Sequence, residues 1–415
     1  MGVKFQYIVL LIICFLGVTG FSRVIEVCNQ CEIKSIKNAV AIAQDGDTIL
    51  IKEGVYKEND INIINKSIRI VGENYPVVDG EMKGSVFSFQ ASDFSIEGLK
   101  IINVGRSYTK DFAAIVTVGA QNFVIKNNIL ENVYFGILLE KSSYGIVDNN
   151  RLSSNAVSEA NSGNGIHLWY SNNIQIKNNR VNQMRDGIYI EFGNDCLIEN
   201  NTTTNNVRYG LHFMFSNNND YLNNTFEKNG AGVAVMFSKK IRMIGNTFRK
   251  SWGDGSYGLL LKEITDSELT NNVFDNNTIG INADGASRIV YKQNNFHKNG
   301  YAIKVHGACY NNTFVENNFL HNAFDVSYHG NINQNVFDGN YWTAYSGYDL
   351  DKDGVGDVPY RPVKLFSYLV NKTPEAIVLL RSLFMDIIDF SEKVSPVFTP
   401  ADLIDNNPKM KKIAW

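Results

Sequence analysis

The sequence is poor in proline and cysteine, and its charges nearly cancel. Only 7 of the 415 residues are proline and 5 are cysteine, and the formal net charge is −3 at pH 7. Nucleic-acid binding needs a strongly basic surface, so this charge gives no reason to expect DNA or RNA as a partner. Beyond the first twenty residues no apolar run is long enough to span a membrane. Asparagine is abundant instead, which argues against a helical protein because its side chain competes for backbone hydrogen bonds.

The first twenty residues have the pattern of a secretory signal peptide. Lys4 precedes an apolar run from Tyr7 to Val18, and small residues lead to Gly20. A charged start, a short apolar stretch and small residues at the end are typical of such a leader. We therefore expect residues 1–20 to be removed. The mature chain would be exported as a soluble protein, or held at a membrane by a partner. An uncleaved membrane anchor is the less favoured alternative, because the apolar run is short.

The strongest pattern is an Asn-Asn pair, or a close variant, that returns mostly every 22 or 23 residues. The pairs begin at Asn127, Asn149, Asn178, Asn200, Asn223, Gly245, Asn271, Asn294 and Asn317. Each unit holds a short apolar strand, the pair, a glycine and a second strand of alternating character. A period of about 22 residues made of strands indicates a solenoid. The Leu-x-x-Leu-x-Leu pattern of leucine-rich repeats is absent. The sequence therefore predicts an all-β fold, a right-handed parallel β-helix.

The asparagines have a physical reason to recur at the corners of such a solenoid. Asn tolerates the left-handed backbone of a sharp corner, and stacked amides can hydrogen-bond from turn to turn. We predict that one column holds Asn128, Asn150, Asn179, Asn201 and Asn224. The longer intervals mark two loops that leave the solenoid, at residues 153–164 and 250–257.

The ends of the chain differ from the repeats. We expect an N-terminal cap over residues 21–47, with a capping helix over 35–43, and the β-helix over 48–340. An Asp-rich segment (341–363) and a helical tail (364–415) follow. Within the tail, residues 374–392 read as one helix with more apolar surface than capping requires. We expect this helix and the tail through Met410 to dock on a partner.

Two outward columns follow from aligning the second strands by their glycines. In YGLHFMFSNNN (209–219), Leu211, Phe213 and Phe215 are expected in the core, so His212 and Met214 face outward. The first outward column then contains His167, Tyr189, His212, Ala234 and Leu260. The second contains Trp169, Glu191, Met214, Met236 and Lys262. Neighbouring turns lie about 4.8 Å apart, so Met214 and Met236 are expected side by side.

Two thioethers and one imidazole suit Cu(I), which prefers soft ligands. The sequence therefore suggests that His212, Met214 and Met236 form an exposed Cu(I) transfer site. An equally weighted alternative is that they pack under the loops or against a partner, because Met is a flexible gap filler.

A second metal motif lies near the C-terminal end, in DLDKDGVGD (349–357). Asp349, Asp351, Asp353 and Asp357 follow the spacing of a calcium loop, with Gly354 for the turn. The Glu that an EF-hand needs at its twelfth position is replaced by Tyr360. We predict a calcium-type oxygen cage without the EF-hand fold, and a solvated acidic turn is the alternative.

The cysteines and the absent catalytic signatures narrow the function. In an exported protein Cys28 and Cys31 are best explained by a structural disulfide, although a copper or redox role stays open. Cys196 and Cys309 are expected to be small core residues. The Asp-Pro-His-Asp signature of alginate epimerases is absent, and so are the polygalacturonase signatures. A lyase that uses arginine as the base is harder to exclude, since Arg180, Arg208 and Arg242 exist, but we do not expect them to align with stacked acids.

Several longer motifs resemble the NosD family of periplasmic proteins that serve the maturation of nitrous oxide reductase. The motifs are YGLHFMFSNNN (209–219), GVAVMFSKKIRMIGNTF (232–248), YGLLLKEITDSELTNNVF (257–274), GNYWTAYSGYDLDKDGVGDVPYRPV (339–363) and PADLIDNNPKM (400–410). The 339–363 block and the tail are the specific ones, and the resemblance covers nearly all of the mature chain.

The resemblance implies a periplasmic accessory protein rather than an enzyme. Its implied partners are an ABC transporter, with a permease and an ATPase, a copper-chaperone lipoprotein, and the reductase whose copper centre is assembled. Contact with the membrane would then come only through the transporter. The Cys28–Cys31 motif departs from what the family leads us to expect. A carbohydrate-active β-helix enzyme, of the polysaccharide lyase or epimerase type, is the alternative function.

Overall fold

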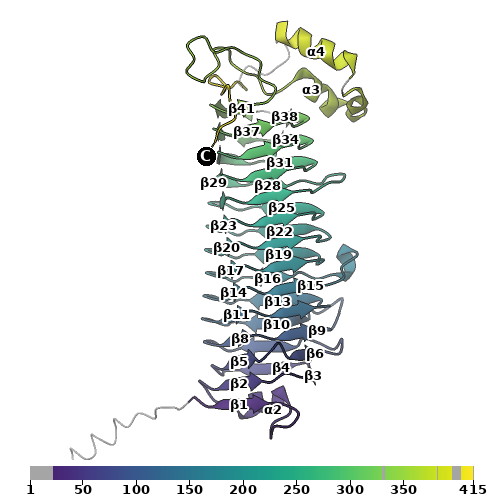
Figure 1. The fold of residues 1–415 in the computed structure, drawn as a ribbon, viewed down its shortest axis with the longest axis vertical. Helices are drawn as coiled ribbons and strands as arrows, with labels where there is room; N and C mark the ends of the chain where they lie inside the picture. The colour runs from purple at the N-terminus through teal and green to yellow at the C-terminus, as the bar shows by residue number, and fades with distance from the viewer. Residues whose placement is uncertain (1–21, 330–331, 381, 395–402, 415) are drawn as a thin grey trace, which may run out of the picture.

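The chain winds into a long parallel β-helix whose sheets run along its length (Figure 1). The computed structural model describes residues 22–329, 332–380, 382–394 and 403–414, so the expected signal peptide lies outside the described residues. Neighbouring strands of a sheet pair in parallel and come from successive turns, as in β19 with β22 and β22 with β25. The predicted all-β solenoid is confirmed.

Three long sheets, A, B and C, form the sides of the solenoid, and a short two-stranded sheet adds to it near the C-terminal end. Sheet A contains β1 (Val24–Val27), β2 (Thr48–Ile51), β5 (Arg69–Gly72), β8 (Ser95–Glu97), β11 (Val124–Lys126), β14 (Ile146–Asp148), β17 (Gln175–Lys177), β20 (Leu197–Glu199), β23 (Asp220–Leu222), β26 (Arg242–Ile244), β29 (Thr265–Thr270), β32 (Ser287–Lys292), β36 (Thr313–Val315) and β40 (Val336–Asp338). Sheet B contains β3 (Val55–Lys57), β6 (Val77–Asp79), β9 (Lys100–Ile102), β12 (Ile129–Glu131), β15 (Arg151–Ser153), β18 (Arg180–Asn182), β21 (Thr202–Thr204), β24 (Thr225–Glu227), β27 (Thr247–Arg249), β30 (Val273–Asp275), β33 (Asn295–His297), β37 (Asn318–Leu320) and β41 (Tyr341–Trp342). Sheet C contains β4 (Ile61–Ile64), β7 (Phe87–Gln90), β10 (Ala113–Val118), β13 (Phe135–Glu140), β16 (Ile166–Trp169), β19 (Asp186–Glu191), β22 (Tyr209–Met214), β25 (Ala231–Met236), β28 (Leu259–Lys262), β31 (Ile279–Asp284), β34 (Tyr301–His306) and β38 (Phe324–His329). The short sheet pairs β35 (Cys309–Tyr310) with β39 (Ile332–Asn333).

The two residues of each Asn-Asn pair have different structural roles at the corner between sheets A and B. The first, such as Asn200 with φ 55°, takes the left-handed backbone conformation. The second, such as Asn201, is buried, and its Nδ2 donates to Asn224 Oδ1 at 3.0 Å and to Ile176 O at 2.8 Å. Asn179 donates to Asn201 in the same way. The predicted column is therefore confirmed. It runs through Asn128, Asn150, Asn179, Asn201, Asn224, Asn246, Asn272, Asn294, Asn317 and Asn340.

Aromatic rings stack inside the solenoid in the same turn-by-turn manner. A column of fully buried rings runs from Phe226 on β24 to Trp342 on β41, with neighbouring centroids 4.0–5.3 Å apart. Each ring therefore packs on the ring of the next turn, and the core continues along the axis as one apolar column.

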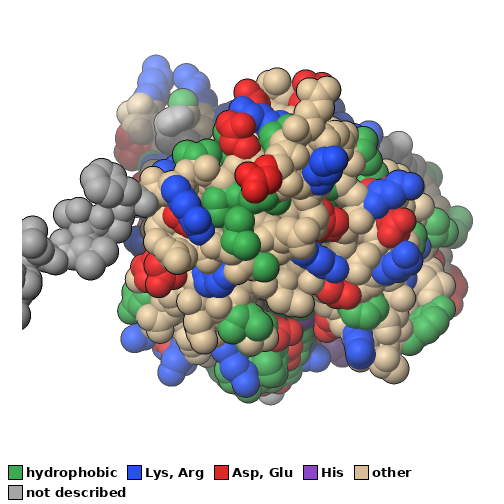
Figure 2. Space-filling model, turned by 90° about the horizontal axis from the view of Figure 1, so that it is seen from below, with side chains coloured by type: hydrophobic (Ala, Val, Ile, Leu, Met, Phe, Trp, Pro, Cys, Tyr) green, Lys and Arg blue, Asp and Glu red, His purple; other side chains and the backbone are tan. Residues whose placement is uncertain are grey.

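The N-terminal end carries a strand as well as a cap. β1 pairs with β2, so sheet A begins at Val24, before the expected start at Thr48. Helix α2 (Ile36–Ile42) follows, with Ser35 as its N-cap. Cys28 and Cys31 form the expected disulfide, and Cys196 and Cys309 are buried free thiols. Seen from this end, charges of both signs are interspersed (Figure 2).

Short helices leave the solenoid at the loops and at the C-terminal end, and residues 374–392 do not form the single helix that was expected. A 3-10 helix, η1 (Glu159–Asn161), lies in the loop 153–164. At the C-terminal end the chain forms α3 (Leu365–Lys372), a second 3-10 helix, η2 (Pro374–Leu379), and α4 (Leu383–Val394). The helical pattern is interrupted after η2, because the backbone of Leu380 leaves the helical region at ψ 124°. α4 stands clear of the sheets in Figure 1. No helix among the described residues is long and apolar enough to cross a bilayer.

The last described residues return to the solenoid instead of continuing the helical tail. The Asp405 carboxylate is fully buried and accepts from Gly339 N, Asn340 Nδ2 and Trp342 Nε1 at 2.9–3.1 Å. Asp405 thus ends the asparagine ladder. The chain then runs beside β41, and Ile413 N donates to Asn318 Oδ1 at 3.0 Å. The segment 403–414 is therefore committed to the last turns and is not a free docking tail.

Candidate functional site

The outward face of sheet C carries the predicted columns in register. His167, Tyr189, His212, Ala234 and Leu260 are successive Cα partners from β16 to β28. The inward neighbours Leu211 and Phe213 are fully buried in the core, which confirms that His212 and Met214 point the other way. Phe215 was expected in the core with them and is exposed instead. It takes a left-handed φ of 50° at the corner, which turns its ring out onto a ladder with Phe192.

The two methionines lie side by side, as the register predicted. Met214 and Met236 are Cα partners on β22 and β25, and both side chains are half-buried. Tyr189 Oη donates a weak hydrogen bond to Met214 Sδ at 3.9 Å. Met236 packs against a small apolar cluster on the outward side of sheet C, formed by Ala231, Ala234, Tyr257 and Ile279. The thioether pair thus has an apolar flank, with Tyr257 supplied by the loop that precedes β28.

His212 is buried beneath its neighbours, although the sequence suggested an exposed ligand. Its exposed fraction is 5%, because the rings of Tyr189 and Tyr209 lie 4.8 Å and 4.9 Å from its centroid. Its Nδ1 lies 3.2 Å from Arg208 Nη2 and 3.7 Å from a carboxylate oxygen of Asp186. The imidazole is therefore positioned by an ion pair and two tyrosines, and it is not a free surface group.

A fully buried carboxylate, Asp186, lies at the centre of this arrangement. Burial acts to raise its pKa, but hydrogen bonds from His212 and Arg208 outweigh burial and hold the pKa below its ordinary value. Arg208 chelates Asp186 with its Nε and Nη2 atoms. Arg242 pairs with Asp220 in the same way one turn away. The expectation that the arginines do not align with stacked acids was therefore wrong for Arg208 and Arg242, whereas Arg180 has Arg151 and Thr202 as its strand partners. Asp186 is the first residue of β19, and Arg208 immediately precedes β22.

The tautomer of His212 decides whether it is available as a ligand. Arg208 can only donate, so its contact with Nδ1 requires the tautomer with the proton on Nε2. In the other tautomer Nδ1–H faces Asp186, and Nε2 is free to bind a metal ion. His212 Nε2 is buried and has no hydrogen-bond partner among the described residues. A carboxylate behind the second nitrogen is the usual arrangement of metal-binding histidines.

His167 lies two column positions before His212, with Tyr189 between them, and belongs to the same stack. Its ring is 4.7 Å from Tyr189 and 5.7 Å from Phe135. Burial and the nearby Arg185 lower the pKa of His167 to about 3, so the imidazole is neutral at physiological pH. Neither ring nitrogen has a hydrogen-bond partner among the described residues. The sequence placed His167 in the column but gave no sign that its ring nitrogens are buried.

The geometry fits a soft metal ion more readily than acid–base chemistry. Two thioethers in register and an imidazole with an unpartnered nitrogen on the same strand are donors that Cu(I) accepts. Met214 and His212 are two residues apart on one face, so their Cα atoms lie about 6–7 Å apart. Of the nearby carboxylates, Asp186 is fully buried and already paired, and Glu191 is the strand partner of Met214 beside Tyr189. At this site copper would be an ion that the side chains hold and pass on, not a resident cofactor.

The Asp-rich loop forms a separate candidate metal site at the C-terminal end. Carboxylate oxygens of Asp349, Asp351 and Asp353 lie within 4.8 Å of one another. Asp357 is not part of this group, and its Oδ2 accepts from Leu350 N at 2.7 Å. Gly354 takes a φ of 86°, which supplies the turn. Calcium binding by this loop stays a prediction, with three carboxylates gathered and the fourth engaged elsewhere.

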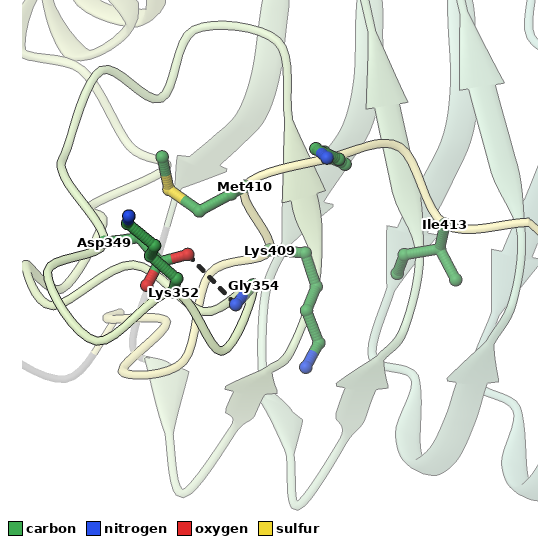
Figure 3. A pocket seen from close by; sticks show the side chains of 7 residues that line it. Asp349, Lys352, Gly354, Lys409, Met410 and Ile413 are labelled. Atoms are coloured by element: carbon green, nitrogen blue, oxygen red, sulfur yellow. Dashed lines mark hydrogen bonds between the residues drawn. The ribbon is translucent and has the colours of Figure 1, made fainter.

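The tail closes one side of this loop and leaves a pocket between them. Gly354 N donates to Asp349 at 3.0 Å, and Met410 N of the tail donates to Gly354 O at 3.0 Å (Figure 3). The pocket measures about 560 Å³ and is lined in part by Lys352, Lys409 and Met410. The calcium-type loop and the Asp405 segment thus form one connected C-terminal closure.

Sequence reasoning missed the supporting residues of the sheet C site. Asp186 and Arg208 lie at the starts of strands, and Tyr209 and Tyr257 precede the glycines from which the columns were counted. A signal was present, since Asp186 precedes Gly187 and Arg208 lies just before Gly210 in consecutive repeats. Counting backward from the glycines would have placed an acid beside a base.

Comparison of the fold with solved structures finds carbohydrate enzymes. The A-module of the mannuronan C-5 epimerase AlgE6 of Azotobacter vinelandii matches with a TM-score of 0.55 at 13% identity, covering 72% of this chain and 92% of that one. The catalytic domain of a GH87 α-1,3-glucanase matches with a TM-score of 0.61 at 15% identity, covering 76% of this chain and 69% of that one. At such identities the likeness shows the fold alone.

Comparison of the sequence identifies a family. The model of the family described as "Periplasmic copper-binding protein (NosD)" matches residues 153–347, which include His212, Met214 and Met236. A relative from Pseudomonas aeruginosa, named "Probable ABC transporter binding protein NosD", is 30% identical over 84% of this chain and 85% of its own length. A second relative of the same name, from Stutzerimonas stutzeri, is 28% identical over 84% of each chain. The chain belongs to the NosD family of periplasmic copper-binding proteins.

Proposed function

We propose that this protein is a periplasmic accessory protein that hands copper to the assembling copper centre of nitrous oxide reductase. In this role it works with an ABC transporter and receives copper from a copper-chaperone lipoprotein. The proposal gives it no catalytic step of its own. The family supplies copper binding and the relatives' name supplies the transporter. The route of copper from the lipoprotein to the reductase, and the reductase as its recipient, are part of the proposal.

One observation carries the copper assignment, namely the register of Met214 with Met236 on the outward face of sheet C. The fold does not require methionine there, because the next turn has Lys262 at the same position. His212 adds an imidazole on the same strand, and its Nε2 is free to bind in the tautomer that points Nδ1–H toward Asp186. Because thioethers bind Cu(I) without demanding full burial, such a site can also release its ion.

The copper assignment is tested by Met214→Leu with Met236→Leu, combined with His212→Gln. Leucine conserves volume and apolarity, and glutamine keeps a polar group beside Asp186 and Arg208. We expect Cu(I) affinity, measured by competition with a chelator, to fall at least tenfold, and the copper content of the reductase to fall in cells. Met243→Leu is the matched control, because Met243 is a core methionine with 1% exposure. Unchanged Cu(I) affinity in the triple variant would leave only a packing role.

The docking surface for the transporter permease is α4. One side of this helix packs on α3 through Met385 and Ile388. The other side exposes large apolar side chains, with exposed fractions of 75% for Leu383, 55% for Ile387 and 69% for Phe390. Such a patch on a short helix outside the solenoid is typical of an interaction site. The segment 403–414 is excluded from this surface, because Asp405 binds the last turn.

The transporter assignment is tested by Ile387→Ser with Phe390→Ser. Both side chains are exposed, so the double variant should still fold. It should no longer co-purify with the permease and the ATPase. Val157→Ser is the matched control, because Val157 is an apolar residue of the loop 153–164 with 90% exposure. Retained co-purification in the double variant would refute the α4 assignment. A truncation at Lys364 is unsuitable, since it also removes the Asp405 cap.

The alternative, a carbohydrate-active enzyme, has one observation in its favour. Asp186, Arg208 and Tyr189 lie together on the outward face of a fold that carbohydrate enzymes share. The burial of Asp186 and the raised pKa of Tyr189, to about 12 through burial and Glu191, work against both groups as proton carriers. Incubation with oligouronates separates the two functions. An absorbance change from unsaturated uronates would favour the enzyme, and copper in the protein without that change favours the accessory role.

A further inference from the structure

The outward column that contains Met214 and Met236 continues beyond Lys262 with a second set of donor side chains. Its next members are Asp284 on β31, His306 on β34 and His329 on β38. The whole chain has only 6 His and 8 Met among 415 residues. Two histidines in direct register, in the column that already holds two methionines in register, are therefore a concentration of metal donors that composition does not explain.

The two imidazoles are close enough to share one ion. Their centroids lie 6.4 Å apart. A metal–nitrogen distance of about 2.0–2.1 Å puts the centroids of two opposed ligating rings about 6 Å apart. No ion pair or hydrogen bond to either imidazole is found among the described residues. The rings are thus at the right separation and are not engaged elsewhere.

Asp284 supplies a carboxylate beside the histidines. A Cβ added at Gly307, the residue after His306, would come within 3.0 Å of Asp284 Oδ1, so this carboxylate lies against the turn that follows His306. The three groups are not gathered within 4.8 Å, as those of Asp349, Asp351 and Asp353 are. Because His329 is exposed, its side chain can change rotamer and turn toward His306 and Asp284.

We propose that Asp284, His306 and His329 form a second copper site, which takes Cu(II). Imidazole and carboxylate are harder donors than thioethers, and Cu(II) binds such sets more tightly than other divalent ions of the first transition row. The proposal deepens the proposed function, on which its role in copper handling rests, but binding at this site does not depend on the methionine pair. Lys262 separates the two sets, and Met236 and His306 lie three turns, or about 14 Å, apart.

The protonation state of His306 is compatible with metal binding. Burial and the neighbouring Lys304 lower its pKa, and Asp284 opposes them only in part. The imidazole is therefore neutral near pH 7 and offers a lone pair without competition from a proton.

The experiment measures Cu(II) binding to the purified full chain without a histidine tag. Electron paramagnetic resonance should show one equivalent of Cu(II) with nitrogen hyperfine coupling, and His306→Ala with His329→Ala should remove this signal and weaken Cu(II) binding at least tenfold. Asp284→Asn should weaken binding less. Circular dichroism establishes that each variant is folded, and a misfolded double variant is replaced by His329→Ala alone, because His329 is exposed.

The matched control is the other histidine pair, His297 and His321, whose centroids are 6.5 Å apart. His297 Nδ1 is held by Asp275 at 2.7 Å and is Cα partner to Leu320, not to His321. Substituting this pair with alanine should leave the Cu(II) signal unchanged. An equal loss in the control, no loss in the His306/His329 variant, or binding of Zn²⁺ but not Cu(II) would each overturn the proposal. Retention of the Cu(II) signal in Met214→Leu with Met236→Leu distinguishes this site from the proposed Cu(I) site, so one can fail without the other.

Discussion

Two columns of side chains run along the same solenoid, and they follow opposite rules. The inner corner repeats asparagine from Asn128 to Asn340, because each amide satisfies backbone groups that every turn presents. The outward column of sheet C changes its chemistry at almost every turn. It reads Trp169, Glu191, Met214, Met236, Lys262, Asp284, His306 and His329. The fold dictates the first column and leaves the second free, so residues of the second are where function is expected. Substitutions in the inner column should therefore cost stability and those in the outer column should not.

The largest loss of stability is expected from Asn201→Leu in the middle of the ladder. Leucine has a similar size but leaves Asn179 N, Ile176 O and their partners buried without hydrogen bonds. At about 1–3 kcal/mol for each such group, the free energy of unfolding should fall by about 3–5 kcal/mol. Denaturant unfolding measures the effect. The control is Asn200→Gly, which accepts the same left-handed backbone at an exposed position and should change stability little. Equal effects of the two would show that the ladder is not what holds the corner.

A smaller loss, about 2 kcal/mol, is expected from Asp405→Ala at the end of the ladder. The donors of Gly339, Asn340 and Trp342 lose their acceptor, but water can reach them once the tail detaches. The same variant should expose residues 403–414 to limited proteolysis. Asp338→Ala is the control, because its contact with Asn407 is exposed. Unchanged proteolysis in Asp405→Ala would mean that the tail is held by other contacts.

Removal of calcium should have the next largest effect. If the Asp349 loop binds Ca²⁺ and its concentration is about ten times Kd, chelation removes about 1.4 kcal/mol and lowers Tm by a few degrees. Asp351→Asn should abolish the chelator effect, whereas Asp357→Asn should largely preserve it, since Asp357 stands outside the carboxylate group. If the melting temperature changes neither when a chelator is added nor when Ca²⁺ is added back, the loop is a solvated turn.

The burial of the His167 ring nitrogens predicts that stability depends on pH. The pKa of His167 is about 3 in the folded chain and 6.5 ordinarily, so the unfolded chain binds the proton more tightly. Stability should therefore fall as pH decreases from 6.5 toward 3, by about 1 kcal/mol between pH 6.5 and 5.5 from this group. His167→Phe, which fits the stack between Phe135 and Tyr189, should remove this part of the slope. Urea titrations at several pH values measure it, with the exposed His321→Phe as control. A slope unchanged by His167→Phe would show that the ring is hydrated.

The contrast between the columns also explains how far the sequence could predict the structure. The solenoid, its inner ladder and the outward register follow from spacing, because one turn of a parallel β-helix imposes the same corner on every repeat. Phe215 was misplaced because the alternation of inward and outward side chains was continued one residue beyond the end of β22. Phe215 lies in a corner with left-handed backbone. The helix over 374–392 was misplaced because periodicity does not show the turn at Leu380.

The candidate site could be predicted only in part. Register placed Met214 beside Met236, since a column is a property of the fold. Burial of His212 could not be foreseen, because it depends on Arg208 and Tyr209 folding over the sheet from outside the aligned strand centres. Likewise the return of Asp405 to Asn340 joins residues 65 positions apart, and no repeat connects them.

The smallest change in stability is expected where the proposed function is concentrated. Met214→Leu with Met236→Leu should alter the free energy of unfolding by less than about 1 kcal/mol, because both side chains are half-buried outside the core and leucine conserves their volume. Phe213→Leu, on the inward side of the same strand, is the matched control. It should cost about 1–3 kcal/mol, since it leaves a void beside Tyr221, whose ring lies 4.5 Å away. Urea unfolding of the variants measures both. If the methionine pair cost as much as Phe213, the outward column would be a packing surface like the core, and the difference between the two columns would no longer point to copper.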